Sequence, residues 1–162
     1  MIVPLANATF YMQKIGFTES LEKVLKEDPR YDREAYLFLR DALDYTIKLR
    51  KRQKSDISRH VTGQELLEGV RRYAIEQFGP MVPTVFEAWN IHESLDVGRM
   101  VFNLIRVGIF GKTENDSMDD FRDGFDFHEA FVKPYLPTRR VLVRPAVRPG
   151  AKSHRKRAIG NA

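Results

Sequence analysis

Thr62-Gly63-Gln64-Glu65 opens the stretch of sequence that decides the fold, which runs from Val61 to Phe127. A threonine followed three residues later by a glutamate is the pattern of a capping box, in which each side chain accepts from the other residue's backbone amide. Val61 and Leu66 flank the box at the positions of a hydrophobic staple. Apolar residues follow at helical spacing until Gly79-Pro80, a pair that ends a helix. The sequence therefore predicts a well-defined helix between Thr62 and Gly79.

Two more helices and a hairpin are predicted downstream. Val82, Val85, Phe86 and Trp89 share one helical face, and Ser94 is a candidate N-cap for a helix that ends at Gly108. The apolar pair Ile109-Phe110, a polar loop, and phenylalanines at 121, 125 and 127 then predict a β-hairpin. Three helices followed by a hairpin is the winged-helix order. The expected core of this unit consists of Leu67, Val70, Phe86, Trp89, Val101 and Leu104.

The fold class predicted for the whole chain is mainly α (α+β). Residues 1–57 are expected to form an N-terminal helical segment that packs on a winged-helix-like core at 58–132. In that segment a brief helix around Val24 ends at Asp28-Pro29, and Asp32 caps a longer helix. Phe10 to Phe17 is left open between a short strand and an anchoring segment. The alternative to a winged helix is a plain helical domain with an irregular C-terminal excursion.

The composition suits one domain with extensions. The chain has 162 residues, of which 43% are hydrophobic, and its 11 Phe, 6 Tyr and 1 Trp supply ample material for a core. No apolar run approaches the ~20 residues that cross a bilayer, and residues 1–10 lack the pattern of a secretory signal. The absence of cysteine excludes disulfides and thiolate metal sites. These features predict a cytoplasmic protein without a membrane partner.

Charge is divided unequally along the chain. Residues 138–162 contain eight Lys or Arg and no Asp or Glu, which leaves residues 1–137 with 19 cations against 22 acids, a net charge of −3. Arg-Pro occurs twice in this tail and favours extended backbone, and the last residues have no apolar period, so residues 133–162 are expected to be disordered when free. An acidic body with a basic arm is typical of a polyanion-binding protein. The predicted nucleic-acid-binding residues of the tail are Arg139, Arg140, Arg144, Arg148, Lys152, Arg155, Lys156 and Arg157.

Two further polar patterns fall on helices. Arg99, Asn103 and Arg106 share one face of the helix after Ser94, and in a winged helix that element lies in the DNA major groove, where Arg and Asn read base edges. The same face also suits a protein partner or plain solvation. Residues 48–54 hold five cations at the end of the Asp32-capped helix, which indicates either a solvated helix end or a polyanion contact.

No catalytic motif is complete. His92-Glu93 and His128-Glu129 begin like the zinc-protease helix, but the second histidine at i+4 is absent from both. The acidic run at 114–123 lacks the glutamate that closes a calcium loop, and Gly-Lys-Thr at 111–113 lacks the four-residue spacing of a P-loop. We therefore predict no cofactor, no metal site and no enzymatic activity, unless distant segments assemble an active site.

Several segments resemble a family of short, uncharacterised bacterial proteins that has no established activity. The resemblance rests on residues 59–69 (RHVTGQELLEG), 77–81 (QFGPM) and 112–117 (KTENDS), and it extends from about Phe10 to Phe131. It implies a bacterial cytoplasmic origin. The basic tail after Thr138 is an addition to the family's usual length, so the resemblance does not extend to the tail.

These observations favour a non-enzymatic nucleic-acid-associated protein. An acidic helical body would be brought to RNA or DNA by the basic tail, within a larger nucleoprotein assembly. The alternative is a protein–protein interaction module, a winged-helix-like adaptor with no direct nucleic-acid role.

Overall fold

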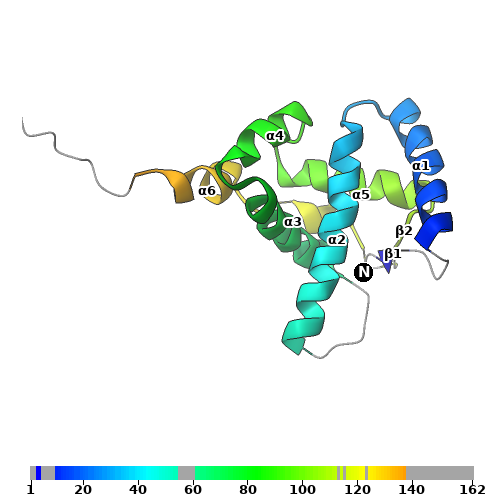
Figure 1. Ribbon diagram of the computed structural model, residues 1–162, viewed down its shortest axis with the longest axis horizontal. Coiled ribbons are helices and arrows are strands. Elements are labelled where there is room, and N and C mark those ends of the chain that lie inside the picture. The colour runs from blue at the N-terminus through cyan, green and yellow to red at the C-terminus, as the bar shows by residue number, and fades with distance from the viewer. Residues whose placement is uncertain are drawn as a thin grey trace, which may run out of the picture.

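The computed structural model describes residues 3–4, 10–54, 61–112, 114, 116–122 and 124–137, and most of them are helical (Figure 1). The α-helices are α1 (Phe10–Glu27), α2 (Arg33–Lys54), α3 (Gly63–Phe78), α4 (Val82–Ala88), α5 (Ser94–Arg106) and α6 (Phe127–Phe131). Short 3₁₀ turns occur at η1 (Gly79–Met81), η2 (Met118–Phe121) and η3 (Lys133–Tyr135). Within the described part of the chain, no helix combines the length and the apolar character that crossing a bilayer requires.

The predicted start and end of the helix at Thr62 are confirmed. Thr62 Oγ1 accepts from the Glu65 amide at 3.2 Å, and Glu65 Oε2 accepts from the Thr62 amide at 2.9 Å. At the other end, Gly79 has a φ of +52°, a left-handed conformation that glycine adopts without a steric penalty, and its amide donates to the Ile75 carbonyl. The capping box and the glycine therefore set both bounds of α3.

The centre of the fold is the antiparallel pair of α2 and α3. Arg50 near the end of α2 meets Glu65 near the start of α3, whereas Phe38 near the start of α2 meets Phe78 at the end of α3. Between these contacts the two backbones approach so closely that a Cβ on Gly69 would overlap Thr46 Oγ1. This oxygen is fixed, because it donates to the Ala42 carbonyl at 2.7 Å. The absence of a side chain at Gly69 is therefore a condition of this packing.

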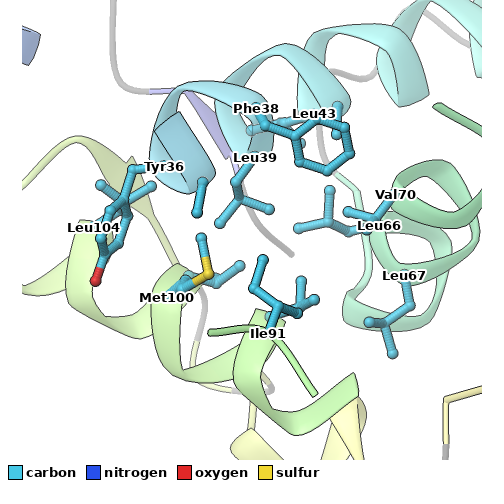
Figure 2. Packing of buried hydrophobic residues seen from close by; sticks show 14 of the residues in the cluster. Tyr36, Phe38, Leu39, Leu43, Leu66, Leu67, Val70, Ile91, Met100 and Leu104 are labelled. Carbon is cyan, nitrogen blue, oxygen red and sulfur yellow. The ribbon is translucent and has the colours of Figure 1, made fainter. Parts of the chain in front are cut away.

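One hydrophobic core joins α2 to the later helices. Figure 2 shows Tyr36, Leu39 and Leu43 of α2 directed toward Leu66 and Val70 of α3 and toward Met100 and Leu104 of α5. Five of the six expected core residues, Leu67, Val70, Phe86, Val101 and Leu104, are buried. Trp89 is only half-buried, but its ring contacts Phe38 at 5.4 Å and Phe78 at 5.6 Å between centroids. The N-terminal helices and the central stretch are thus packed on the same apolar cluster.

The predicted C-terminal hairpin is wrong, and a winged-helix core is not confirmed. Phe110 does lie in a short strand, β2 (Phe110–Gly111), but its antiparallel partner is β1 (Val3–Pro4), with Val3 opposite Gly111. Phe121 belongs to η2 and Phe127 begins α6. Ser117 and Asp126 cap these helical turns, since their side chains accept from the amides of residues 119 and 129. Local capping therefore prevailed over the alternation of phenylalanines, which had indicated a strand.

The segment around η2 packs into spaces left by glycines. Phe121 lies over Gly63 at the start of α3 and over Gly98 in α5, where an added Cβ would come within 3.2 Å and 2.7 Å of its ring. Gly124 in turn lies against Leu67. Phe121 is thus packed between α3 and α5, whereas Phe127 contacts Phe86 of α4 and Phe125 contacts Phe131 of α6.

The N-terminal helix is longer than the sequence indicated. Residues 10–17, which the sequence left open, continue the predicted turn around Val24, so that α1 has 18 residues and ends before Asp28. Phe17, Leu21 and Val24 are buried on the side that faces the core. The predicted stop at Asp28-Pro29 and the start after Asp32 are confirmed, since the Glu34 amide donates to Asp32 Oδ1 at 2.8 Å.

We predict that Gly69→Ala destabilises the protein by roughly 1–3 kcal/mol, the usual cost of overpacking, because the new methyl group must displace Thr46 or separate α2 from α3. The matched control is Gly16→Ala in α1, where nothing lies within 4 Å of the added Cβ. The control variant should be stabilised by up to about 1 kcal/mol, since alanine favours helix over glycine. Urea unfolding of both variants measures the difference. Equal effects at the two sites would contradict the close crossing.

Candidate functional site

Polar side chains gather where the turn between α1 and α2 meets α5, and we name this group the α5 polar cluster. Three of its members, Asp28, Asp96 and Asn103, are nearly inaccessible to solvent. Buried carboxylates and amides are costly unless hydrogen bonds satisfy them, so their partners decide what the cluster can do. The α5 polar cluster consists of Asp28, Arg30, Tyr31, Tyr36, Asp96, Arg99 and Asn103.

Asn103 joins α5 to the start of α2. Its Nδ2 donates to Asp28 Oδ2 at 2.8 Å and to the Tyr36 hydroxyl at 3.0 Å. Asp28 also accepts two hydrogen bonds from the guanidinium of Arg30, at 2.7 and 2.6 Å. The Arg30 contact, with help from Asn103, holds the pKa of Asp28 well below its ordinary value, although burial acts in the opposite direction. This carboxylate is therefore charged and fully paired.

Asp96 organises the other end of the cluster. Its Oδ2 accepts from the backbone amides of His92 and Glu93, and its Oδ1 accepts from the Tyr31 hydroxyl at 2.7 Å and from Arg99 at 2.6 Å. Burial alone would raise the pKa of Asp96, but these hydrogen bonds lower it overall. Burial and the neighbouring carboxylate raise the pKa of Tyr31, so the phenol keeps its proton and donates it. Asp96 thus accepts the hydrogen bonds of the backbone amides that precede α5.

Ser94, the predicted N-cap of α5, has another role. It is the first residue of the helix and is buried, its Oγ donates to the Phe121 carbonyl at 2.8 Å, and it accepts from the Gly124 amide at 3.2 Å. These two hydrogen bonds of Ser94 hold the η2 segment against the start of α5. It also lines a groove with His92, Arg122, Phe125 and His128, but its only hydroxyl hydrogen is directed away to a carbonyl.

The three residues expected to form an exposed polar face on α5 do not do so. Asn103 is 8% exposed and bonded within the protein, and Arg99 pairs with Asp96 and Glu93. Arg106 is half exposed and its Nη2 lies 3.0 Å from Glu27 Oε2. Asn103 is therefore not available to read a base, because it lies against α2 and the turn before it, whereas Arg99 and Arg106 stay partly exposed beside their acidic partners. That this face reads DNA bases stays a prediction. Helical periodicity identified the polar stripe, but it could not show that the partner of Asn103 lies 75 residues earlier in the chain.

The other predicted residues are accounted for as follows. The eight tail cations, from Arg139 to Arg157, lie outside the described residues. In the acidic segment, Asp119 pairs with Arg122 and Asp120 accepts from the Ser117 amide. Among the residues that the structure describes, no group of three or more metal-ligand side chains could hold an ion.

Sequence reasoning missed Asp28, Tyr31 and Asp96 as members of one site. Asp28 had been interpreted only as part of a helix stop, and Asp96 only as the residue that breaks a zinc-protease pattern. One local signal was present, because an acid at the third position of a helix commonly accepts from the N-cap amide. The contact between Tyr31 and Asp96 spans 65 residues and left no local signal.

Comparison with known proteins found no matching family model, no matching curated protein and no matching solved structure. The resemblance to short bacterial proteins therefore stays a prediction.

We predict that Asn103→Leu lowers the free energy of unfolding by roughly 1–3 kcal/mol, because Asp28 and the Tyr36 hydroxyl would lose a buried donor. Arg106→Gln, which removes an exposed ion pair from the same helix, should change stability by less than about 1 kcal/mol. Chemical denaturation of both variants tests the assignment. A large cost at Arg106 with none at Asn103 would contradict the buried position of Asn103.

A pH dependence follows from the lowered pKa of Asp28. A carboxylate whose pKa is lower in the folded state contributes stability at neutral pH, and this stability is lost as the pH falls below the ordinary carboxyl value of about 4. The variant Asp28→Asn should be roughly 1–3 kcal/mol less stable than the wild type at pH 7, with a smaller difference at pH 3. Unfolding curves across this range measure the difference. A constant difference at all pH values would show that Asp28 is not ionised in the fold.

Proposed function

We propose that this chain is a non-enzymatic, cytoplasmic nucleic-acid-associated protein. Its helical body is brought to RNA or DNA by the basic segment 138–162, as part of a nucleoprotein assembly. The single observation that carries the proposal is the segregation of charge: eight cations without an acid follow a body with a net charge of −3. Phosphate backbones attract such an arm irrespective of base sequence.

Two features of the body support this division of roles. The polar side chains of α5 are used inside the protein, so the body does not present that helix to a duplex groove. Tyr135 and Leu136, close to the last described residue at 137, are 44% and 51% exposed, so the described part of the chain ends at the surface. A segment that starts there is able to follow a polyanion without disturbing the core.

A protein–protein interaction module is the second candidate, and one observation favours it. Met81, Tyr135 and Leu136 are large apolar side chains that remain exposed, and the Tyr135 hydroxyl lies close to Gly79. These residues bring η1 and η3 together next to the start of the basic segment. Apolar surface of this kind is more frequent at binding sites than elsewhere on a protein.

We predict that removal of residues 138–162 abolishes most nucleic-acid binding and leaves the melting temperature of the body nearly unchanged, since among the described residues every buried member of the hydrophobic core precedes Val132. For the full chain, log affinity should fall with log salt at a slope of about −0.7 per phosphate neutralised on single strands and −0.9 on duplex. A salt titration of RNA and duplex DNA binding with both chains provides the measurement.

Equal binding by the full and truncated chains, or a flat response to salt, would remove the tail from the mechanism. The apolar residues of η1 and η3 would then be the first candidates for a binding site. Met81→Ser and Leu136→Ser, tested for loss of a co-purifying protein after nuclease treatment, would address that second function.

A further inference from the structure

The last turns of α2 carry an exposed basic surface beside α3. Tyr45, Lys48 and Arg52 follow at i, i+3 and i+7, so they share one side of the helix, which points away from the buried positions at Leu43 and Ile47. Lys48 and Arg52 are exposed, and so is Lys51 on the adjacent side of the helix. Arg72 of α3 adds a further cation close to the same surface, since its charge and that of Arg52 both act on the Tyr45 hydroxyl. We name these residues, together with Tyr73, the α2–α3 basic face.

Two tyrosine rings stand within this surface. Tyr45 and Tyr73 pack with their centroids 5.2 Å apart, and Tyr73 stacks on Phe38 of the core at 5.3 Å. Both tyrosines are half-buried, so one side of the pair is fixed and the other remains accessible. A rigid ring that is accessible to solvent and surrounded by cations can stack on an unpaired base at a small cost in conformational entropy.

The acids near this surface are largely occupied. The Glu68 carboxylate is held between Arg71 and Arg72, at 2.8 and 2.6 Å, which lowers its pKa to about 2. Burial raises the pKa of Tyr45, and its hydrogen bond to Glu76 raises it further, so the hydroxyl is neutral. Asp44 is the acid nearest to Lys48 along α2. Among the described residues, Lys51 and Arg52 have no carboxylate partner.

Completion of the helix end does not explain the charge of Lys48. Cations near a C-terminus interact with the helix dipole within the last turn, whereas Lys48 lies almost two turns before the end of α2 at Lys54. Arg50 is the cation of this run that serves the fold, because its Nη1 lies 3.3 Å from Glu65. Lys48 is therefore available to a ligand, and so are the exposed Lys51 and Arg52, which have no carboxylate partner in the described part of the chain.

We propose that the α2–α3 basic face is a second nucleic-acid contact that selects single strands, with its cations along the phosphates and Tyr45 stacked on a base. This inference rests on the proposed function and deepens it, because it assigns a preferred substrate class to the body. A duplex is excluded from the stacking contact, since its bases already stack on one another. The basic segment would supply affinity, and this face would supply the preference for unpaired strands.

The first test removes two charges from the full chain by Lys48→Gln/Lys51→Gln. The control is Lys23→Gln/Lys26→Gln, which removes two exposed lysines with the same spacing near the end of α1. Binding of a labelled oligothymidylate is measured against salt concentration. The first pair should make the log–log slope less negative by about 1.4, corresponding to two phosphates at about 0.7 each, whereas the control pair should leave it nearly unchanged.

The second test concerns the ring and compares Tyr45→Leu with Tyr45→Phe, again in the full chain. Loss of stacking in Tyr45→Leu should weaken binding of the oligothymidylate about tenfold, whereas Tyr45→Phe keeps the ring and should bind like the wild type. Binding of duplex DNA should be the same for all three proteins. The melting temperatures of the variants show whether the fold is retained.

Several results would overturn the inference. If the full chain binds but the two lysine pairs behave alike, this face is not a contact, although the proposed function stands. If Tyr45→Leu weakens duplex binding or heparin binding as much as oligothymidylate binding, the surface is a general polyanion site without base stacking. If the full chain binds neither RNA nor DNA, both the inference and the proposed function are wrong.

Discussion

The close crossing of α2 and α3 at Thr46 and Gly69 is the contact on which the rest of the fold depends. It determines the distance between α2 and α3, the two helices with the most extensive mutual contact. That distance in turn determines the positions of the apolar side chains that meet α5. It also brings Phe38, Tyr45 and Tyr73 into one series of ring contacts that extends from the core to the surface. A side chain at residue 69 would change the core and this surface together.

The α5 polar cluster represents a different kind of constraint. Apolar contacts are tolerant of small rotations, whereas Asp28 and Asp96 accept hydrogen bonds with defined directions from three segments of the chain: the turn before α2, the residues before α5, and α5 itself. Replacing buried ionic groups by apolar ones is often neutral for stability, so their main effect here is to specify one orientation of α5. The same pairing keeps Asn103 inside the protein and engages Arg99 with Asp96.

Features encoded within a few residues could be predicted from the sequence. The box at Thr62 and Glu65, the stop at Gly79 and the cap at Asp32 each depend on neighbours along the chain, and all are confirmed. The hairpin was wrong partly because Ser117 and Asp126 cap helical turns, and the expected exposure of Asn103 was wrong because its partner lies far away in the sequence. Contacts over long separations contribute to both differences. Phe121 meets Gly63 and Gly98, and Asn103 meets Asp28, and neither pair leaves a periodic signal in the sequence.

The separation between Asp28 and Asn103 has a consequence for synthesis of the protein. A ribosome makes the chain from its N-terminus, so Asp28 and Tyr36 emerge long before the amide that joins them. Until α5 has been made, the paired helices α2 and α3 expose the apolar face that α5 later covers, together with a carboxylate that lacks one of its donors. Completion of the core is thus delayed until most of the body has left the ribosome. A chain that stalls before residue 103 exposes apolar surface, through which it can aggregate with other chains.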